Sequence, residues 1–256
     1  MYLAGLSWKK AERLLSDGTI AVMPLGSVEE HGPIGPLGTD YLIPEEFARR
    51  IEASFPNDVV VLPAMPYGYA PTLTSFPGTI DIGIETLTAV LNGIATGMLR
   101  SGVRKFLFLN GHGGNNVALD RVALEIYRAG GQAATIDWWI LAGQLNREWI
   151  GGHGAGQEAA MMMALRPEWV DRSDLCDAEV NHFSDALRNT HLHQISFGGG
   201  FVRMIRDVRD SVPTGGFGGP DESSAATPEW GDRMFDAVTE YIEAFIREFL
   251  KLDVGR

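Results

Sequence analysis

Apolar runs alternate with amphipathic stretches along the first half of the chain. The runs are short and bounded by turn residues, as is typical of buried strands, and they lie at Thr19–Leu25, Val59–Leu62, Lys105–Leu109 and Gln132–Ile136. Around them, apolar residues recur with the 3.6-residue period of a helix that faces a core. This period predicts helices over Ile84–Arg100 and Asn116–Ala129. Ser7 can cap a short helix over Trp8–Ser16, and a proline near the start of Ile43–Ser54, with helix formers after it, predicts another helix there.

Strands that alternate with helices predict a mostly parallel sheet with helices on both faces. The second half is less regular: we expect helices over Gln157–Leu165 and Thr227–Lys251, whereas residues 176–224 are glycine-rich and typical of loops. The phenylalanines of this segment cover a neighbouring subunit or the pocket, or they belong to an ordinary loop: Phe183, Phe197, Phe201 and Phe217. No repeat or linker divides the chain, so we expect one three-layer α/β/α domain over residues 1–256.

Composition and charge exclude several classes of partner. The chain has 256 residues and a net charge of −12, without the cluster of Lys and Arg that a nucleic acid needs. No apolar run approaches the roughly 18–20 residues that cross a bilayer, and the start does not have the pattern of a secretory signal. Cys176 is the only cysteine, which fits a reducing compartment. We therefore expect a cytoplasmic protein that binds neither nucleic acid nor membrane.

Three polar clusters follow predicted strands or lead into predicted helices. The first, GSVEEHGPIGPLGTD, comes directly after the first strand and contains Glu29, Glu30, His31 and Asp40. Glu29 and His31 are two residues apart, so an extended backbone points both side chains the same way. The glycines and prolines after His31 favour a rigid loop that returns Asp40 to the same centre. The alternative is a surface loop with solvated charges.

The second cluster, NGHGGN, joins the third predicted strand to the next helix. Its small residues allow a sharp turn and leave His112 uncovered at the end of the sheet. His112 could be a metal ligand, or the backbone N–H groups could cradle a phosphate. The segment lacks the Gly-Lys-Ser/Thr ending and the G-x-G-x-x-G pattern of nucleotide-binding loops. A tight turn with an incidental histidine is the third interpretation.

The third cluster, WIGGHGAGQE, runs from Trp149 to Glu158. Its His153 follows two glycines that supply no bulk, so a packing role does not explain it well. Glu158 begins a predicted helix, where the helix dipole favours a carboxylate even without a ligand.

Together the clusters supply imidazoles and carboxylates in the mixture that zinc, iron or manganese prefers. Five ligands are too many for one open catalytic zinc, and they suit two metals that share one bridging carboxylate. The candidate ligands are Glu29, His31, Asp40, His112 and Glu158. His153 lies beside them in the sequence pattern.

The chain resembles the creatininase (creatinine amidohydrolase) family. The resemblance rests on GSVEEHGPIGPLGTD, LNGHGGN and HGAGQE, together with the tail segment TGGFGGPDESSAATPEWG. It implies a three-layer α/β/α fold, a homo-oligomer that is often a hexamer, and a centre of two divalent metal ions (Zn, Mn or Fe). By position, it implies one metal held by Glu29, Asp40 and His112. It implies a second held by His31, Asp40 and Glu158, with Asp40 as the bridge.

The resemblance also implies roles around the metals. His153 falls on the family's catalytic histidine, and Trp149 on a tryptophan that closes over the substrate. Creatininases proper carry a catalytic glutamate where this chain has Gly114, and their usual motif is HAGxxE rather than HGAGQE. These departures argue against creatinine as the substrate. The base is then Glu30, or a metal-bound hydroxide that needs no separate base.

We expect a hydrolase that attacks a small cyclic amide, a formamide or a related carbonyl compound with metal-activated water. His153 would stabilise the oxyanion or protonate the leaving group. Relatives with the NGHGGN form also include a peptidase for a modified-peptide redox cofactor and an enzyme that opens an oxidised inositol ring. Ring opening of an inositol-derived ketone is therefore an alternative. Two further classes stay open: a phosphate- or nucleotide-binding protein that uses the GHGGN loop, and a metal-containing scaffold or regulatory subunit.

Overall fold

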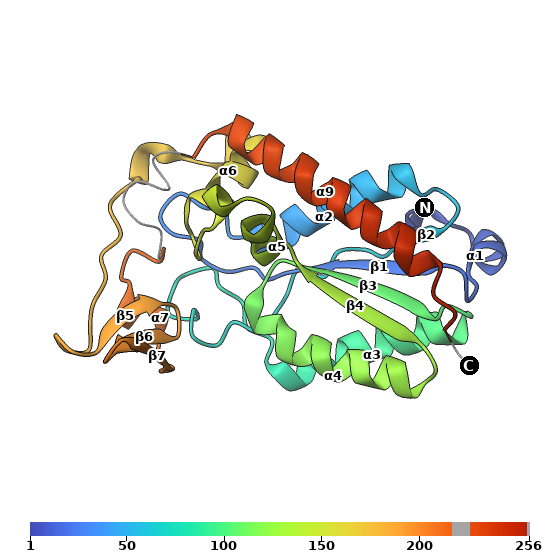
Figure 1. Cartoon of the computed structure of the whole chain (residues 1–256), viewed down its shortest axis with the longest axis horizontal. Helices are drawn as coiled ribbons and strands as arrows, with labels where there is room; N and C mark the ends of the chain where they lie inside the picture. Colours follow the sequence, from blue (N-terminus) through green and yellow to red (C-terminus); the bar gives the residue numbers. More distant parts are fainter. Residues whose placement is uncertain (217–225, 255–256) are drawn as a thin grey trace.

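A four-stranded parallel sheet organises the fold (Figure 1). The computed structural model describes residues 1–216 and 226–254. The strands lie in the order β2–β1–β3–β4, and each neighbouring pair is parallel. They are β1 (Ile20–Leu25), β2 (Val59–Val61), β3 (Lys105–Asn110) and β4 (Gln132–Asp137). Every bound lies within one residue of its predicted position, so the sequence prediction of this sheet is confirmed.

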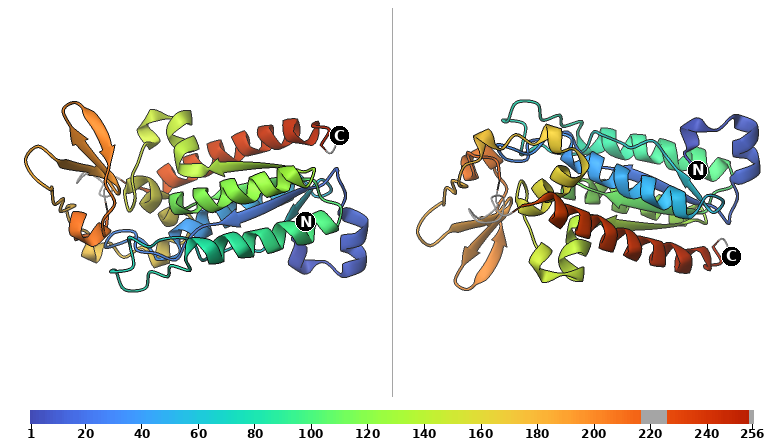
Figure 2. Two further views of the ribbon diagram at one scale, coloured as in Figure 1. Left: turned by 90° about the horizontal axis from the view of Figure 1, so that it is seen from below. Right: turned by 90° about the horizontal axis from the view of Figure 1, so that it is seen from above.

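Helices cover both faces of the sheet, which confirms the three predicted layers (Figures 1 and 2). One face carries α3 (Ile84–Arg100) and α4 (Asn116–Arg128). The other carries α2 (Thr39–Ser54), α5 (Trp138–Leu145), α6 (Gly156–Leu165) and α9 (Pro228–Leu250). The short α1 (Trp8–Leu14) precedes β1. Single 3-10 turns lie at Leu3–Gly5, Gly113–Asn115, Arg147–Trp149, Pro167–Trp169 and Arg172–Asp174.

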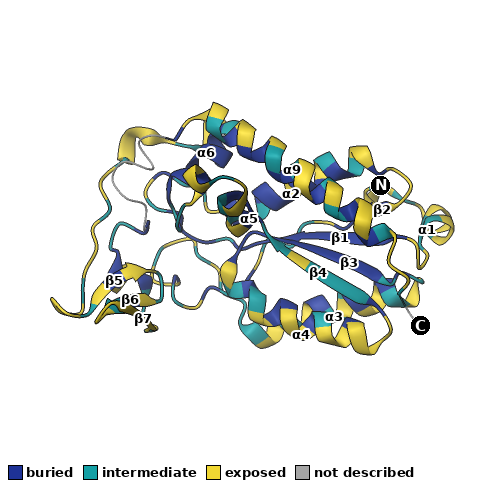
Figure 3. Ribbon diagram, viewed as in Figure 1, coloured by how far each residue is buried: buried dark blue, intermediate teal, exposed yellow. Residues whose placement is uncertain are grey.

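The central strands are buried on both sides (Figure 3). In β1, Ile20 and Val22 face the core under α2 and α9, whereas Ala21 and Met23 face the core under α3. This two-residue alternation follows from the pleat of a strand. Because both faces are covered, nearly every position of the strand is apolar, which explains why the sequence pattern predicted these strands.

Helix α2 begins earlier than predicted, and this places a candidate ligand. Proline favours the first turn of a helix, so the sequence predicted a start at Ile43. The helix instead begins at Thr39, with Pro44 inside it. Pro44 has no N–H with which to bond the carbonyl of Asp40 four residues earlier. Asp40 therefore lies in the first turn of α2, and the prediction that a loop carries it was wrong.

The segment predicted as loop contains a second, smaller sheet. Its antiparallel strands are β5 (Arg188–His191), β6 (Gln194–Phe197) and β7 (Gly200–Arg203), followed by the short α7 (Val208–Ser211). Figure 1 places this sheet at the end of the molecule opposite the two termini. All four residues of β7 are exposed, so no apolar alternation marked it in the sequence. Phe217 and part of the glycine-rich tail motif lie outside the described residues.

No helix within the described ranges is long and apolar enough to cross a membrane.

Aromatic side chains join α2, α5 and α9 above the sheet. Phe47 is fully buried, with its ring centroid 6.3 Å from that of Trp138 and 5.2 Å from that of Phe235. Tight packing of this kind leaves a cavity when a large side chain is truncated.

We expect Phe47→Ala to lower the free energy of unfolding by about 3–5 kcal/mol, because it removes buried contacts and leaves a void. Chemical denaturation followed by circular dichroism measures this change. The matched control is Phe197→Ala on β6, which is 56% exposed and should change stability by less than about 0.5 kcal/mol. Equal losses in the two variants would contradict this picture of the core.

Candidate metal centre

The candidate site lies where the order of the strands reverses. β1 and β3 are neighbours, but the chain continues from β1 toward one edge of the sheet and from β3 toward the other. Loops that leave two such strands in opposite directions open a crevice at their carboxyl ends. The loop after β1 carries Glu29 and His31, and the loop after β3 carries His112. The first turn of α6 adds Glu158.

Close backbone contacts hold Asp40 against the ends of these strands. A Cβ atom at Gly111 would lie 1.8 Å from the carbonyl oxygen of Asp40, and one at Gly26 would lie 2.2 Å from it. Neither distance is possible for a real side chain. Glycine at both positions therefore allows the start of α2 to pack directly onto the ends of β1 and β3.

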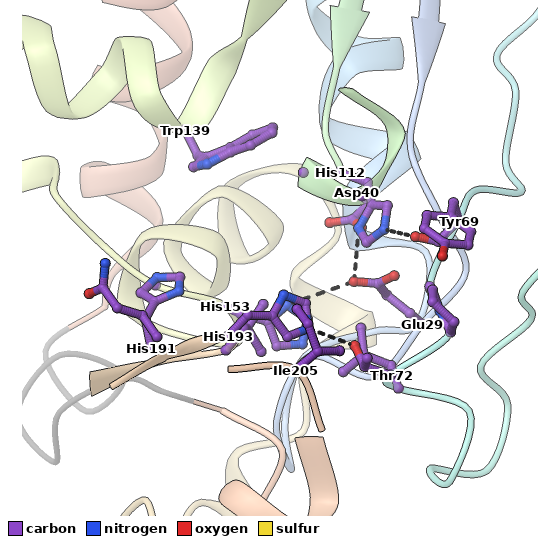
Figure 4. A pocket seen from close by; sticks show the side chains of 18 of the residues that line it. Glu29, Asp40, Tyr69, Thr72, His112, Trp139, His153, His191, His193 and Ile205 are labelled. Carbon is purple, nitrogen blue, oxygen red and sulfur yellow. Dashed lines mark hydrogen bonds and ion pairs between the residues drawn. The ribbon is translucent and has the colours of Figure 1, made fainter. Parts of the chain in front are cut away.

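The His112 ring directs its Nδ1 atom at two carboxylates (Figure 4). Its Nε2 lies 2.8 Å from the carbonyl oxygen of Tyr69, which can only accept a hydrogen bond. The Nε2 atom therefore carries the proton, and in the neutral ring Nδ1 keeps a lone pair. Nδ1 lies 3.1 Å from Glu29 Oε1 and 3.0 Å from Asp40 Oδ2.

His31 repeats this arrangement on the other side of Asp40. Its Nδ1 lies 3.0 Å from the carbonyl oxygen of Glu29 and donates to it. The opposite nitrogen, Nε2, lies 2.8 Å from Asp40 Oδ1 and 3.9 Å from Glu158 Oε2. Each carboxylate oxygen of Asp40 thus faces a different histidine.

Without a cation, this arrangement requires protons. Burial lowers the pKa of His31, but the Asp40 and Glu158 carboxylates outweigh it and raise that pKa well above its usual value. Burial of His112 is outweighed in the same way by Glu29 and Asp40, which raise the pKa of its ring. Burial raises the pKa of Asp40, yet the two imidazoles hold it well below its usual value. The negative charges of the carboxylates therefore favour a positive charge at His31 Nε2 and at His112 Nδ1.

A divalent cation fits where these protons would lie. The ligand atoms of Glu29, Asp40 and His112 lie within 4.8 Å of one another, and so do those of His31, Asp40 and Glu158. Glu29 Oε2 is buried and accepts no hydrogen bond from any described residue, and Asp40 Oδ2 accepts one from His112 Nδ1 only when that nitrogen is protonated. Buried acceptors without donors are costly unless a cation joins them. The structure thus brings all five candidate ligands together in the predicted two groups.

Glu158 differs from the other carboxylates. Burial, together with the charge of Asp40, raises its pKa despite the opposing effect of His31 and His153. Its Oε2 accepts a hydrogen bond from the backbone N–H of Gly154 at 2.8 Å, which fixes it toward His31.

His153 lies beside the two groups of candidate ligands, and a contact with Glu30 holds its ring. Its Nε2 lies 2.9 Å from Glu30 Oε1, and its Nδ1 lies 3.8 Å from Glu29 Oε1. The other oxygen of Glu30 accepts from the N–H of Gly32 at 2.9 Å. Burial lowers the pKa of His153, but Glu30 outweighs it and raises that pKa. Glu30 is buried and does not line the cavity, so its contacts are those of a residue that orients His153.

Comparisons with known proteins identify the family of the chain. A family model described as creatininase, creatinine amidohydrolase, matches residues 4–246. The chain belongs to the creatininase family. Members of this family are metal-dependent amidohydrolases, and the chain is an enzyme of that class.

Individual relatives differ in what they act on. Creatinine amidohydrolase of Pseudomonas putida is 28% identical over 200 residues, which cover 69% of this chain and 76% of that protein. The mycofactocin precursor peptide peptidase of Mycolicibacterium smegmatis is 31% identical over 177 residues, 67% of this chain and 68% of that one. A solved manganese creatininase is 24% identical with a TM-score of 0.77, and the match covers 98% of this chain and 99% of that chain. This last likeness establishes the shared fold.

One family position has no room for a side chain here. A Cβ atom at Gly114 would lie 2.1 Å from the carbonyl oxygen of Tyr69 and 2.4 Å from His112 Nε2. The hydrogen bond that fixes the His112 ring therefore occupies the space that a residue at 114 needs. In this member of the creatininase family, a glutamate side chain at position 114, which the resemblance assigns to creatininases proper, does not fit.

The tryptophan predicted to contact substrate lies outside the cavity. Trp149 is 8% exposed and packs in the hydrophobic core. The indole that lines the cavity is Trp139, at the start of α5 (Figure 4). The role of Trp149 stays a prediction, and the geometry favours Trp139 for a substrate contact.

A cavity of about 750 Å³ leads to the centre. Phe201, one of the phenylalanines that the sequence analysis considered as a cover of the pocket, lines it. Besides the predicted residues, it is also lined by side chains that sequence reasoning missed: Tyr69, Trp139, His191, His193 and Arg203. Most of them lie on the small sheet or on loops without a motif. For Tyr69, the contact uses a backbone carbonyl, which leaves no signal in the sequence.

We expect Gly114→Ala to displace His112 and to remove the cation bound there, because the new methyl group overlaps the Tyr69–His112 hydrogen bond. Elemental analysis after dialysis measures the loss. The matched control is Gly113→Ala, where a Cβ atom meets only Trp139 Cζ2, at 3.6 Å, and the cation content should stay unchanged. Equal cation content in both variants would contradict the role of this hydrogen bond.

Proposed function

We propose that this member of the creatininase family is a hydrolase with two divalent cations that cleaves an amide or a related carbonyl compound. The observation that carries the proposal is the position of Asp40. Its Oδ1 faces His31 and its Oδ2 faces His112, as expected of a carboxylate that bridges two cations.

One cation would be held by Glu29, Asp40 and His112, and the other by His31, Asp40 and Glu158. The nitrogen and oxygen donor set suits zinc, manganese or iron, and cellular supply decides among them. When bound, the pair polarises a substrate carbonyl and lowers the pKa of a coordinated water toward about 7. The carbonyls of Tyr69 and Glu29 fix the tautomers of the two histidines, which is the usual task of groups behind metal ligands.

His153 would handle the proton at the reacting bond. Its Nδ1 is directed toward the centre, and Glu30 holds its Nε2 from the other side. A protonated Nδ1 donates to the developing oxyanion or to the leaving nitrogen, and the Glu30 carboxylate stabilises the imidazolium. We therefore assign Glu30 as a positioning residue and not as the general base that the sequence suggested.

Two other predicted classes fit the site less well. A phosphate cradle at the GHGGN loop would place an anion next to Glu29, Asp40 and Glu158, whose charges repel it. A scaffold without activity has no need of a cavity that leads to a buried, correctly oriented histidine. The small-molecule substrate and the homo-oligomer stay predictions.

We expect Asp40→Asn to lose both cations and all measurable hydrolysis. The amide of asparagine has only one acceptor oxygen, whereas the proposed bridge needs one oxygen for each cation. Elemental analysis and an activity screen with amides and formamides test this. Asp120→Asn, an exposed change on α4, should keep two cations per chain. An Asp40→Asn protein that still holds two cations would refute the bridge.

We expect His153→Ala to keep both cations and to lower kcat by about 10²–10⁴-fold, the usual contribution of a positioned acid or base. Steady-state kinetics with the best amide of the screen, combined with elemental analysis, separates the two properties. Glu30→Gln should lower kcat less and leave KM unchanged. Loss of a cation from His153→Ala would make this residue a ligand instead.

A further inference from the structure

The small sheet forms the wall of the cavity that faces the metal centre. Leu192, His193, Phe201 and Arg203 line the same cavity as the predicted ligands. In Figure 4, His193 lies beside Thr72, between the centre and the small sheet. A wall opposite the reacting groups contacts the part of the substrate that does not react, and this part determines specificity.

The loop at residues 70–76 anchors this wall. Val208 N donates to the Thr72 carbonyl at 2.7 Å, and Thr72 Oγ1 lies 2.9 Å from His193 Nε2. Ser75 Oγ donates to Asp207 Oδ1 at 2.6 Å. The first residue pair to reach the sheet is Thr72 with His193, which holds the turn between β5 and β6, whereas the other two contacts hold the segment that follows β7 against the same loop.

Arg203 brings a positive charge to this wall. It is the one lysine or arginine that lines the cavity among the residues the structure describes, and no described carboxylate pairs with it. The neighbouring imidazole does not share its charge: burial lowers the pKa of His193, and the Arg203 guanidinium lowers it further. The guanidinium is therefore available to an anion of the substrate.

Gln194 adds a second donor beside Arg203. The two residues are directly paired between β6 and β7, so their side chains lie on the same face. Thr190 Oγ1 donates to Gln194 Oε1 at 3.2 Å, which leaves the amide nitrogen free of this contact. Both residues line the cavity. A guanidinium next to an amide N–H₂ matches the two oxygens of a carboxylate.

The same wall offers apolar surface. Phe201 is two residues before Arg203 and shares its face of β7. Trp139, Val117 and Ile205 also line the cavity. Its volume of about 750 Å³ lies within the roughly 300–1,000 Å³ of pockets that bury drug-sized ligands, so it holds more than a formamide or a single small ring.

We propose that the substrate is an N-acylated amino acid or peptide end with a free carboxylate and an apolar side chain, bound by Arg203 and Gln194 through that carboxylate. This inference rests on the proposed function and narrows its substrate class. Hydrolysis adds water across the C–N bond: the hydroxyl joins the acyl carbon, and the proton goes to the amine nitrogen. Arg203 and Gln194 take no part in that step and act by binding.

The first test measures binding without turnover, on the metal-loaded protein. Calorimetry compares 4-phenylbutanoate with 4-phenylbutanol, which differ in the carboxylate. We expect the carboxylate to bind about 10- to 100-fold more tightly, the scale of a charge-assisted hydrogen bond. Arg203→Met should remove this preference. Arg188→Met, an exposed arginine of β5 outside the cavity, should keep it. A preference that survives in Arg203→Met would assign carboxylate binding to the metal centre and overturn the inference.

The second test separates this inference from the proposed function. We expect the wild-type enzyme to cleave N-acetylphenylalanine with a higher kcat/KM than its carboxamide, and Arg203→Met to reduce the difference through KM. An active amidohydrolase that cleaves both compounds equally would contradict the inference and leave the hydrolase assignment intact. A protein that binds phenylbutanoate through Arg203 but hydrolyses no amide would contradict the hydrolase assignment instead.

Discussion

The site depends on two buried imidazoles, His31 and His112, each of which donates a hydrogen bond from one ring nitrogen to a backbone carbonyl. Because Tyr69 and Glu29 accept those hydrogen bonds through their carbonyls, the inner nitrogens of His112 and His31 face the two oxygens of Asp40. Such a group of acceptors, placed away from water, is stable only around protons or cations. The close backbone contacts at Gly26 and Gly111 bring Asp40 next to the two histidines. The absence of a side chain at Gly114 leaves room for the hydrogen bond between Tyr69 and His112.

The two sheets contribute different parts of the candidate site. The parallel sheet is buried on both faces, and the candidate ligands Glu29, His31 and His112 follow the ends of its strands β1 and β3. The antiparallel sheet is mostly exposed and contributes side chains that reach into the cavity. Relatives in this family act on compounds as different as creatinine and a precursor peptide.

Much of the parallel sheet and of the candidate site could be predicted from the sequence. Strands buried on both faces are almost entirely apolar, so β1 and β3 ended visibly at the clusters that contain Glu29, His31 and His112. The position of Asp40 was harder to place, because Pro44 is typical of a helix start and here lies within α2. Contacts such as Glu30 with His153 join residues 123 positions apart, and no local pattern reports them. The exposed β7 lacked any apolar alternation.

The most direct test of the account is the cation content of the purified wild-type protein. Elemental analysis, after incubation with zinc or manganese and removal of excess metal, should give two divalent cations per chain, because two groups of ligands share Asp40. A protein that retains no cation under these conditions would contradict the account, since the imidazoles and carboxylates of the centre would then be held together by protons alone.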